Sequence, residues 1–301
     1  MSEQDNQGRA GVIFALIAFG IWILFPFYWN ELRDVDPMEI LCHRILWSIP
    51  VLYIIMILNK STGEIARVFR SPKMLLLLSL STVVITINWG LYIWSVANDL
   101  ILQASLGYFM NPLANVLAGL VVFREQLRKW QWVSVGLAVA GVVISVLYAG
   151  VFPWIGVVLA VSFGVYGAVR KLVDVDAVPG LCVETILLFP FATGYLIWLY
   201  MQGTLGFLHL DLKADALMLG AGFVTAMPLV AYVAASKRLP ISTVGMLFYL
   251  VPSGLFVLAT QYYGEEIHTG DIITFAFIWA SLVIFTWERR YTARRNRAEI
   301  V

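Results

Sequence analysis

The stretch 101–126, ILQASLGYFMNPLANVLAGLVVFREQ, returns in recognisable form at 241–266, ISTVGMLFYLVPSGLFVLATQYYGEE. The two segments align at one constant offset of about 140 positions, and such a period is the mark of an internal repeat. The matched pairs are Ile101 with Ile241, Phe109 with Tyr249, Pro112 with Pro252, Phe123 with Tyr263, and Glu125 with Glu265. The sequence therefore predicts a duplicated protein.

The composition around this repeat is that of a membrane protein. Hydrophobic residues make up 60% of the chain and charged residues 13%, and the mean hydropathy is +0.83. An ordinary soluble domain carries about 25% charged residues. The apolar runs are about 18 to 23 residues long, enough for a helix to cross roughly 30 Å of hydrocarbon, and the short alternating segments of a membrane barrel are absent. We therefore expect an all-α polytopic membrane protein.

The apolar runs predict ten transmembrane helices. Residues 1–9 are polar and do not have the layout of a signal peptide, so we expect the first run to stay in the protein. The connections are short, which argues against an inserted soluble domain. The expected helices span about 10–29, 38–58, 74–96, 101–123, 130–148, 152–170, 179–201, 214–236, 241–262 and 271–288.

Lysine and arginine predict which side of the membrane each connection faces, because cytoplasmic loops retain an excess of both. With the N-terminus inside, the outer connections contain only Arg33 and Lys213, and Arg44 lies within the second helix. The other basic residues fall on cytoplasmic segments: Arg9, Lys60, Arg67, Arg70, Lys73, Arg124, Arg128, Lys129, Arg170, Lys171, Lys237, Arg238, Arg289, Arg290, Arg294, Arg295 and Arg297. We therefore expect both termini in the cytoplasm, with the basic tail on an anionic leaflet and no nucleic-acid partner.

Five helices in each half is an odd number, so the second half must enter the membrane from the opposite side. The halves are expected to be 1–149, with helices one to five, and 150–301, with helices six to ten. Inverted repeats are a recurrent design of secondary transporters, in which the solute site lies near the bilayer midplane and access alternates between the two sides.

Ionisable groups inside hydrocarbon are costly, so each one is a candidate functional residue. Arg44 lies about 9 Å along the second helix from Met38, and two interpretations are open. It lines a cavity and contacts a solute, or it extends to the outer headgroups or to backbone carbonyls of a neighbouring helix. His43 beside it could carry a proton, or it is a neutral imidazole hydrogen-bonded between helices.

Glu184 in the seventh helix takes the position of Arg44 at the common offset, but it enters from the cytoplasmic side. A direct ion pair between the two would need long side chains that reach inward, so separate roles are favoured. Glu184 could take up a proton that is coupled to transport, or it is a carboxylate that accepts hydrogen bonds near a helix start.

Two polar and aromatic stripes mark the third and fourth helices. Asn88 and Tyr92 share a helix face, with Trp89 beside it, and Tyr108 and Asn111 form a similar stripe. These stripes predict a cavity lining that binds an organic solute; the alternative is polar and small-residue packing between helices. At the common offset Pro228 replaces Asn88, which favours one asymmetric site.

Other prominent residues are interpreted as structural. Pro112, Pro252, Glu125 and Glu265 recur in both halves, and the two glutamates are expected to hydrogen-bond neighbouring helix ends. The tryptophans at helix ends belong to the interface belt: Trp29, Trp130, Trp132, Trp154 and Trp287. Cys42 and Cys182 fall on opposite sides of the bilayer, so a disulfide is not expected.

Several chemistries have no motif in this chain. A G-x-x-x-x-G-K-[ST] phosphate loop, H-E-x-x-H, G-x-S-x-G and C-x-x-C are all missing from the sequence. We therefore expect neither an enzyme nor an ATP-driven pump, and no cofactor or metal site.

A set of segments in order resembles the RarD group of EamA-type permeases in the drug/metabolite transporter superfamily. They are PMEILCHRILWS at 37–48, NWGLYIWSV at 88–96, QASLGYFMNPLANVLAG at 103–119, FREQLRKWQWVSVGLAVAGV at 123–142, VSFGVYGAVRK at 161–171, GFVTAMPLVAYVAASKRLPIST at 222–243, and YGEEIHTGD at 263–271. The resemblance covers nearly the whole chain. It implies a bacterial inner-membrane protein of two inverted repeats that moves small organic solutes, and it carries an association with chloramphenicol sensitivity.

Together, residues and resemblance favour a secondary transporter, an exporter or exchanger of small organic metabolites or drug-like solutes, with protons as a candidate coupling ion. The alternative is a membrane scaffold or sensor without transport activity, in which the polar residues only fasten helices.

Overall fold

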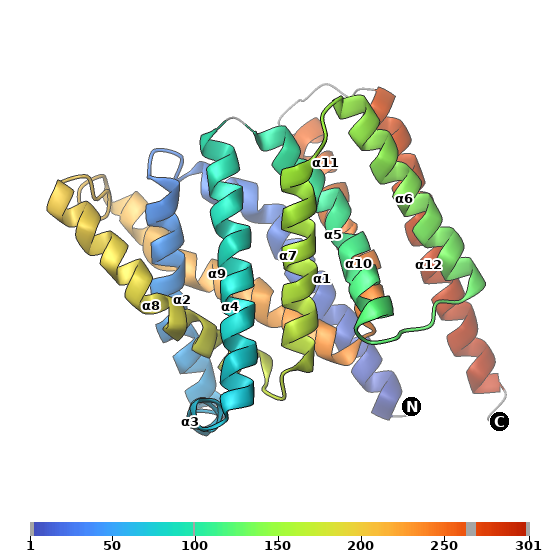
Figure 1. Ribbon diagram of the computed structural model, residues 1–301, viewed down its shortest axis with the longest axis horizontal. Helices are drawn as coiled ribbons and strands as arrows, with labels where there is room; N and C mark the ends of the chain where they lie inside the picture. The colour runs from blue at the N-terminus through green and yellow to red at the C-terminus, as the bar shows by residue number, and fades with distance from the viewer. Residues whose placement is uncertain (1–2, 99, 263–268, 299–301) are drawn as a thin grey trace. The chain divides into compact units, whose positions relative to one another are not determined.

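A computed structural model describes residues 3–98, 100–262 and 269–298. In this part of the chain every regular element is a helix. The helices are α1 (Glu3–Asn30), α2 (Pro37–Leu58), α3 (Gly63–Arg70), α4 (Pro72–Ala97), α5 (Ile101–Val121), α6 (Lys129–Ala149), α7 (Trp154–Leu172), α8 (Ala177–Gln202), α9 (Leu212–Arg238), α10 (Ile241–Phe248), α11 (Leu250–Gln261) and α12 (Thr269–Ala298) (Figure 1).

The described residues contain ten spans that are long and apolar enough to cross a membrane, which confirms the all-helical membrane fold expected from the sequence. Most boundaries lie within two residues of the expected ones. The exceptions are at the two ends, where α1 begins at Glu3 and α12 continues to Ala298. Large apolar side chains such as Leu76 and Phe191 are exposed on these helices, as they are where a protein meets lipid tails.

The ninth expected helix is interrupted. It forms α10 and α11, with a turn at Tyr249 between them. Pro252 has no N–H, so it cannot donate the helical hydrogen bond to the carbonyl of Phe248, and the helix breaks close to that carbonyl. The equivalent Pro112 lies inside the continuous α5, so the two copies of the repeat differ in shape at their shared proline.

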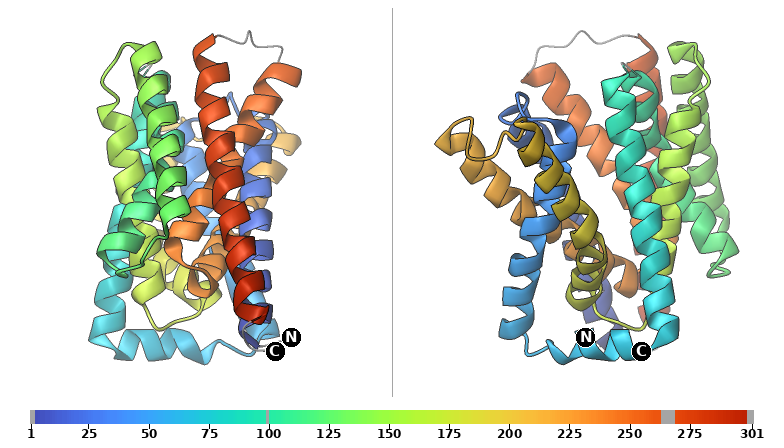
Figure 2. Two further views of the ribbon diagram at one scale, coloured as in Figure 1. Left: turned by 90° about the vertical axis from the view of Figure 1, so that its right-hand side faces the viewer. Right: turned by 60° about the vertical axis from the view of Figure 1, so that its left-hand side comes forward.

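Helix α3 is an additional element between the second and third expected spans. It lies across the ends of α2 and α4 rather than along them (Figure 2). Its Val68 is fully buried against Leu78 and Val183, while Arg67 and Arg70 remain on the polar side. A short amphipathic helix of this kind suits the interface between membrane and water.

The chain forms two compact units, and each unit takes helices from both sequence halves. Unit 1 contains Met1–Ile93 and Val169–Leu239, and unit 2 contains Trp94–Ala168 and Pro240–Val301. The expected division at 149/150 follows the sequence similarity of the two copies and not the contacts between helices. The inverted repeat stays a prediction from that similarity.

In unit 1, α1 packs on α9, and α2 packs on both α8 and α9. The contact between α2 and α9 is a close approach of backbones. A Cβ placed on Gly222 of α9 would lie 2.1 Å from the carbonyl carbon of Trp47. The Ser48 hydroxyl donates to the carbonyl of Gly222 at 3.0 Å and to that of Arg44 at 2.6 Å. Glycine therefore lets two helices meet at the level of Arg44.

In unit 2, α6 packs along α12 and α5 packs along α10 (Figure 1). The serine hydroxyls of Ser134 and Ser281 meet at 3.0 Å between α6 and α12. A hydrophobic cluster between these helices consists of Val116, Val135, Ala138, Met246, Tyr249, Ile278 and Phe285.

The close approach at Gly222 can be tested with a paired substitution. Gly222→Ala should lower the free energy of unfolding by about 3 kcal/mol, the upper end of the usual cost of overpacking, because its methyl group meets backbone atoms that cannot rotate away. The measurement is unfolding of the purified protein in detergent micelles. Gly194→Ala in α8 is the control, since its methyl group meets no atom within 4 Å and should be neutral or slightly stabilising. Equal effects of the two substitutions would contradict the close approach.

Candidate functional site

Three helices of unit 1 place side chains around Arg44 of α2. The Arg44 Nε donates a hydrogen bond to the Thr225 hydroxyl of α9 at 2.9 Å. Its guanidinium carbon lies 5.1 Å from the ring centroid of Trp29, in the last turn of α1, and 5.1 Å from that of Trp89 in α4. We call Trp29, Arg44, Trp89 and Thr225 the arginine–tryptophan cluster.

The cluster holds a positive charge in the membrane-spanning part of the chain. Both ring distances lie within the range of about 6 Å in which an aromatic face attracts a cation. Thr225 is only 4% exposed, whereas Arg44 is half-buried. Indole faces and a hydroxyl from three other helices therefore contact the guanidinium.

Two members of the cluster were not predicted as site residues. Trp29 lies at a helix end and was assigned to the interface belt, yet its ring lies against Arg44. Thr225 is one polar residue in the apolar run of α9, and that isolation is the signal that could have found it. Of the predicted residues, Arg44 and Trp89 are brought together. Trp89 also packs against the buried hydrophobic cluster that consists of Leu41, Cys42, Ile45, Leu188 and Ala192.

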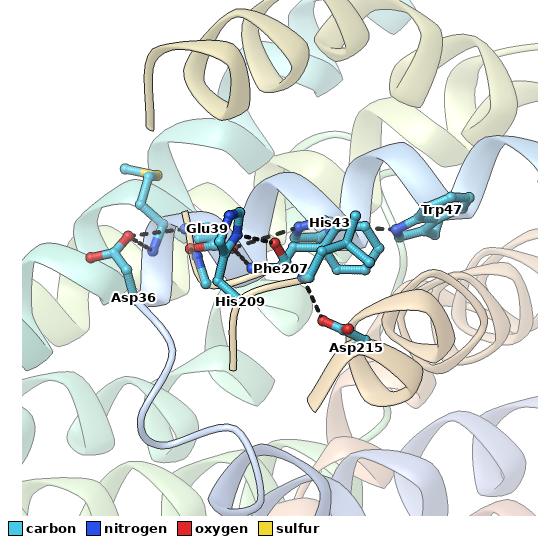
Figure 3. A network of polar contacts seen from close by, with 10 residues as sticks. Asp36, Glu39, His43, Trp47, Phe207, His209 and Asp215 are labelled. Atoms are coloured by element: carbon cyan, nitrogen blue, oxygen red, sulfur yellow. Dashed lines mark hydrogen bonds and ion pairs between the residues drawn. The ribbon is translucent and has the colours of Figure 1, made fainter. Parts of the chain in front are cut away.

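A second set of polar contacts runs along α2 from Trp47 toward the N-terminus of the helix (Figure 3). The Trp47 indole donates to Nδ1 of His43 at 3.0 Å, and Nε2 of His43 lies 3.8 Å from a carboxylate oxygen of Glu39. Because Nδ1 accepts a hydrogen bond, it carries no proton, and His43 is a neutral imidazole with its proton on Nε2. The spacing of four residues places all three side chains on one face.

Glu39 joins α2 to the connection between α8 and α9. Its two carboxylate oxygens accept from the backbone N–H groups of Gly206 and Phe207 at 3.0 and 2.8 Å, and the His43 ring packs 4.7 Å from the ring of Phe207. The N–H of Leu208 donates to Asp215 in the first turn of α9 at 2.8 Å. Figure 3 shows this connection against α2. The hydrogen bonds of Glu39 were not predicted, although its spacing from His43 was visible in the sequence.

Glu184 forms a buried polar group in another part of unit 1. It accepts a short hydrogen bond from Ser81 of α4 and lies 3.6 Å from Nε of Arg170. The Arg170 side chain is fully buried and also donates to the carbonyl of Ala177 at 3.0 Å. Gly180 leaves room for it, because a Cβ there would lie 2.1 Å from Nη1 of Arg170. The sequence placed Arg170 among the cytoplasmic charges and missed this pairing.

The other predicted site residues are divided between the two compact units. Asn88 is half-buried and Tyr92 is 40% exposed, both on α4 in unit 1. Tyr108 and Asn111 lie on α5 in unit 2, where Asn111 is buried and its Oδ1 has no hydrogen-bond partner among the described residues. The two predicted stripes thus belong to different compact units.

The recurring glutamate of the first repeat contacts a helix start in unit 2. Glu125 accepts from the N–H of Ile241 at 2.7 Å, from the N–H of Ser242 at 3.1 Å and from the Ser242 hydroxyl. These N–H groups begin α10 and have no partner within the helix. Glu265 of the second repeat lies outside the described residues.

At the surface, exposed charges pair outside the spans. Arg67 of α3 donates to Glu64 at 2.9 Å and to Asp174 at 2.7 Å, and these hydrogen bonds raise the pKa of Arg67.

Among the described residues, no group of three or more His, Cys, Asp or Glu side chains is placed to hold a metal ion. The cluster offers a fixed cation and aromatic faces, which suit binding.

The chain is similar to proteins of one family. The profile of the EamA-like transporter family matches residues 9–147. Protein RarD of Streptomyces exfoliatus is 40% identical over 298 residues, which cover 99% of this chain and 95% of that protein. A Vibrio cholerae protein described as an uncharacterized transporter is 38% identical over 300 residues, with 99% of each chain covered. A solved crystal structure matches with a TM-score of 0.71 at 15% identity, covering 94% of this chain and 99% of the other, and that likeness concerns the fold.

Ten membrane spans, together with these relatives, define a multi-pass membrane transporter rather than an enzyme. The chain belongs to the RarD group of the EamA-type permeases.

The buried pair of Arg170 and Glu184 gives a stability prediction. Glu184→Ala should lower the free energy of unfolding by about 3–5 kcal/mol, because it leaves a buried guanidinium without its carboxylate. Replacing both partners with apolar residues, Arg170→Met with Glu184→Leu, should recover much of that loss. The measurement is unfolding in detergent micelles. Arg67→Gln removes an exposed pair and should change stability little; a loss from Glu184→Ala no larger than this control would show that the buried pair is not formed.

Proposed function

We propose that the protein is a secondary transporter that moves small organic solutes across the bacterial inner membrane, by efflux or exchange, with alternating access between the two sides. The two inverted five-helix repeats, 1–149 and 150–301, provide the two states of such a mechanism. In this proposal both termini lie in the cytoplasm, as the distribution of Lys and Arg predicts.

The observation that carries the proposal is the arginine–tryptophan cluster. A charge in a membrane span is costly and usually faces a cavity or a partner. Here the guanidinium of Arg44 on α2 is contacted by side chains of α1, α4 and α9, and the residue as a whole is half-buried. A group that its neighbours already hold in place suits a binding residue, since its own immobilisation adds little cost when a solute arrives.

The wider solute path includes the other predicted residues. His43 precedes Arg44 on α2, and Asn88 and Tyr92 flank Trp89 on α4. In unit 2, Tyr108 and the buried Asn111 offer a hydroxyl and an amide oxygen to a solute during the transport cycle. We propose these residues as contacts of the path, and Pro112, Pro252, Glu125 and Glu265 as structural residues of the repeats.

Solute binding should depend on Arg44. In a thermal-shift screen of the purified protein against amino acids, nucleosides, sugars and amphenicols, a solute that binds should raise the unfolding temperature, because binding at a hundredfold excess over Kd stabilises the native state by about 2.7 kcal/mol. Arg44→Gln should lose most of this shift. Arg33→Gln removes the same charge from an exposed side chain and should keep it.

The same screen distinguishes transport from a scaffold or sensor that only uses Arg44 to fasten helices. A scaffold predicts that Arg44→Gln unfolds at a lower temperature and that no solute stabilises the wild type. If a folded Arg44→Gln variant kept the solute-dependent shift in unfolding temperature, the arginine–tryptophan cluster would not be part of the solute path.

We further propose that protons are coupled to transport through Glu184 or His43. Glu184 shares hydrogen-bonding and ionic contacts with Ser81 and Arg170, and Nε2 of His43 faces Glu39. A proton gained or lost by Glu184 or His43 would therefore change its electrostatic interaction with Arg170 or Glu39.

Proteoliposomes with an imposed pH gradient test this coupling. Glu184→Gln, or His43→Gln, should abolish the stimulation of uptake by the gradient while solute exchange without a gradient continues. Glu64→Gln, which changes a half-buried carboxylate on α3 outside the spans, should leave the stimulation intact. Wild-type uptake that is indifferent to the gradient, or a gradient response retained by both variants, would exclude these two groups as the coupling residues.

A further inference from the structure

We propose that α3, together with the two helix ends that it joins, binds the phosphate headgroups of anionic phospholipids such as phosphatidylglycerol. The residues that carry the proposal are Lys60, Arg70 and Lys73, which we call the basic patch, and the neighbouring Phe69. The proposal concerns the lipid around the protein and goes beyond solute transport, so its test needs no transported solute.

The placement of α3 is that of a helix at the boundary between lipid tails and headgroups. It runs across the ends of α2 and α4 (Figure 2), and the two membrane spans beside it end at Leu58 and begin at Pro72. Val68 is fully buried against the protein, whereas Phe69 is exposed and lies about 100° further around the helix. An exposed phenyl ring next to basic side chains is typical of a helix that lies in the membrane surface.

The basic side chains around α3 are of two kinds. Arg67 is paired within the protein, because it donates to Glu64 at 2.9 Å and to Asp174 at 2.7 Å. The three side chains of the basic patch are exposed, and none of them forms an ion pair with a described residue. Their positive charges are therefore available to an anionic partner.

Arg70 and Lys73 lie close together beside a surface that meets lipid tails. Arg70 ends α3 and Lys73 lies in the first turn of α4, so three Cα–Cα steps join them and their Cα atoms are at most about 11 Å apart. Lys73 and Leu76 share a face of α4 because three positions separate them, and Leu76 is 71% exposed. A lipid whose tail lies against Leu76 therefore brings its phosphate to the level of Lys73.

Lys60 occupies a backbone position at which glycine would be less strained. Its φ of 55° is left-handed, and the N–H of Ser61 donates to the carbonyl of Met56 at 2.9 Å, as in a left-handed cap at the end of a helix. A side chain is strained in this conformation, whereas glycine adopts it freely. Strained residues of this kind mark candidate functional positions, and an anionic lipid gives the lysine at this position a role.

Phosphate diesters match the basic patch in charge and in chemistry. Arginine and lysine bind phosphate oxygens through charge-assisted hydrogen bonds, and cations next to a membrane span are attracted to the anionic cytoplasmic leaflet. The connection that contains α3 is expected on that side from the distribution of Lys and Arg. The headgroup of phosphatidylcholine carries a cation of its own, which opposes the approach of the patch because like charges repel.

The test measures which lipid gathers at α3. Ala66→Cys, at an exposed position of α3, carries a fluorophore in protein that is reconstituted into nanodiscs of equal parts phosphatidylglycerol and phosphatidylcholine. Bromine on the lipid tails quenches a nearby fluorophore, so one sample has brominated phosphatidylglycerol and the other brominated phosphatidylcholine. Cys42 and Cys182 are buried, and unsubstituted protein treated with the dye gives the background.

The quenching should indicate that phosphatidylglycerol is enriched at α3 by about fivefold or more, the factor that one cation near an anionic surface contributes. Equal quenching by the two lipids would overturn the proposal and leave the basic patch to a soluble partner. Soluble glycerol phosphate should lower the enrichment no more than sodium sulfate does at equal ionic strength. A larger effect would make a free phosphate the occupant and overturn the lipid assignment.

Charge variants assign the enrichment to the basic patch. Arg70→Gln combined with Lys73→Gln should remove most of it. Glu64→Gln combined with Arg67→Gln is the matched control, because it removes a paired acid and base of α3 without changing the net charge, and it should keep the enrichment. Full enrichment in the folded Arg70→Gln and Lys73→Gln variant, or an equal loss in the control, would overturn the proposal.

Lys60→Gly separates lipid binding from the stability of the helix end. In nanodiscs of phosphatidylcholine alone, this variant should unfold at a higher temperature than the wild type, because glycine relieves the left-handed strain. Addition of phosphatidylglycerol should then raise the unfolding temperature of the wild type more than that of the variant. An equal rise in both proteins would overturn the assignment of Lys60 to the lipid site.

Discussion

The structure depends on one constraint, that polar groups inside the membrane-spanning part must find their partners within the protein because lipid tails offer none. The acidic side chains show how the chain meets it. Glu125 accepts from the N–H groups that begin α10, and Glu39 accepts from two N–H groups of the connection before α9. Each carboxylate thus satisfies backbone donors of a distant segment, and in doing so it fixes that segment in place.

Arginine meets the same constraint in two ways. Arg170 is closed in with Glu184, and Gly180 provides the space for it. Arg44 is held by the faces of Trp29 and Trp89 and by one hydroxyl. Indole faces attract a cation through the ring quadrupole, so the two arginines are held by different kinds of neighbour.

Small residues decide where such a site can form. Gly222 brings the backbone of α9 against that of α2, and Thr225, about one helical turn further along α9, then reaches Arg44. Gly222 thereby positions the hydroxyl that accepts from Nε of Arg44.

Much of the fold could be predicted because the hydrophobic pattern of each helix is local. The ten spans follow from the length of the apolar runs. The interruption at Tyr249 could not be predicted from the repeat. The proline of the first copy lies inside the continuous α5, whereas in the second copy the helix breaks between α10 and α11. The short α3 was missed because eight residues are too few for a clear periodic signal.

The candidate site was predicted in part. Arg44 and Trp89 were found because a charge and an aromatic residue inside an apolar run are conspicuous. Trp29 was assigned to the interface belt from its place at a helix end, and Arg170 to the cytoplasm from its place after an apolar run. Both assignments used position along one helix, whereas the contacts of these residues come from other helices.

The sequence by itself determined the membrane class, the number of spans, the duplicated pattern and the family, since each of these is encoded in composition, length or order along the chain. Only the tertiary structure decided which polar groups meet. The repeat that begins at Ile101 marks the two copies, but the compact units draw helices from both. Contacts such as those of Arg44 with Thr225 and of Glu125 with α10 join residues more than 100 positions apart, and helix packing alone sets their geometry.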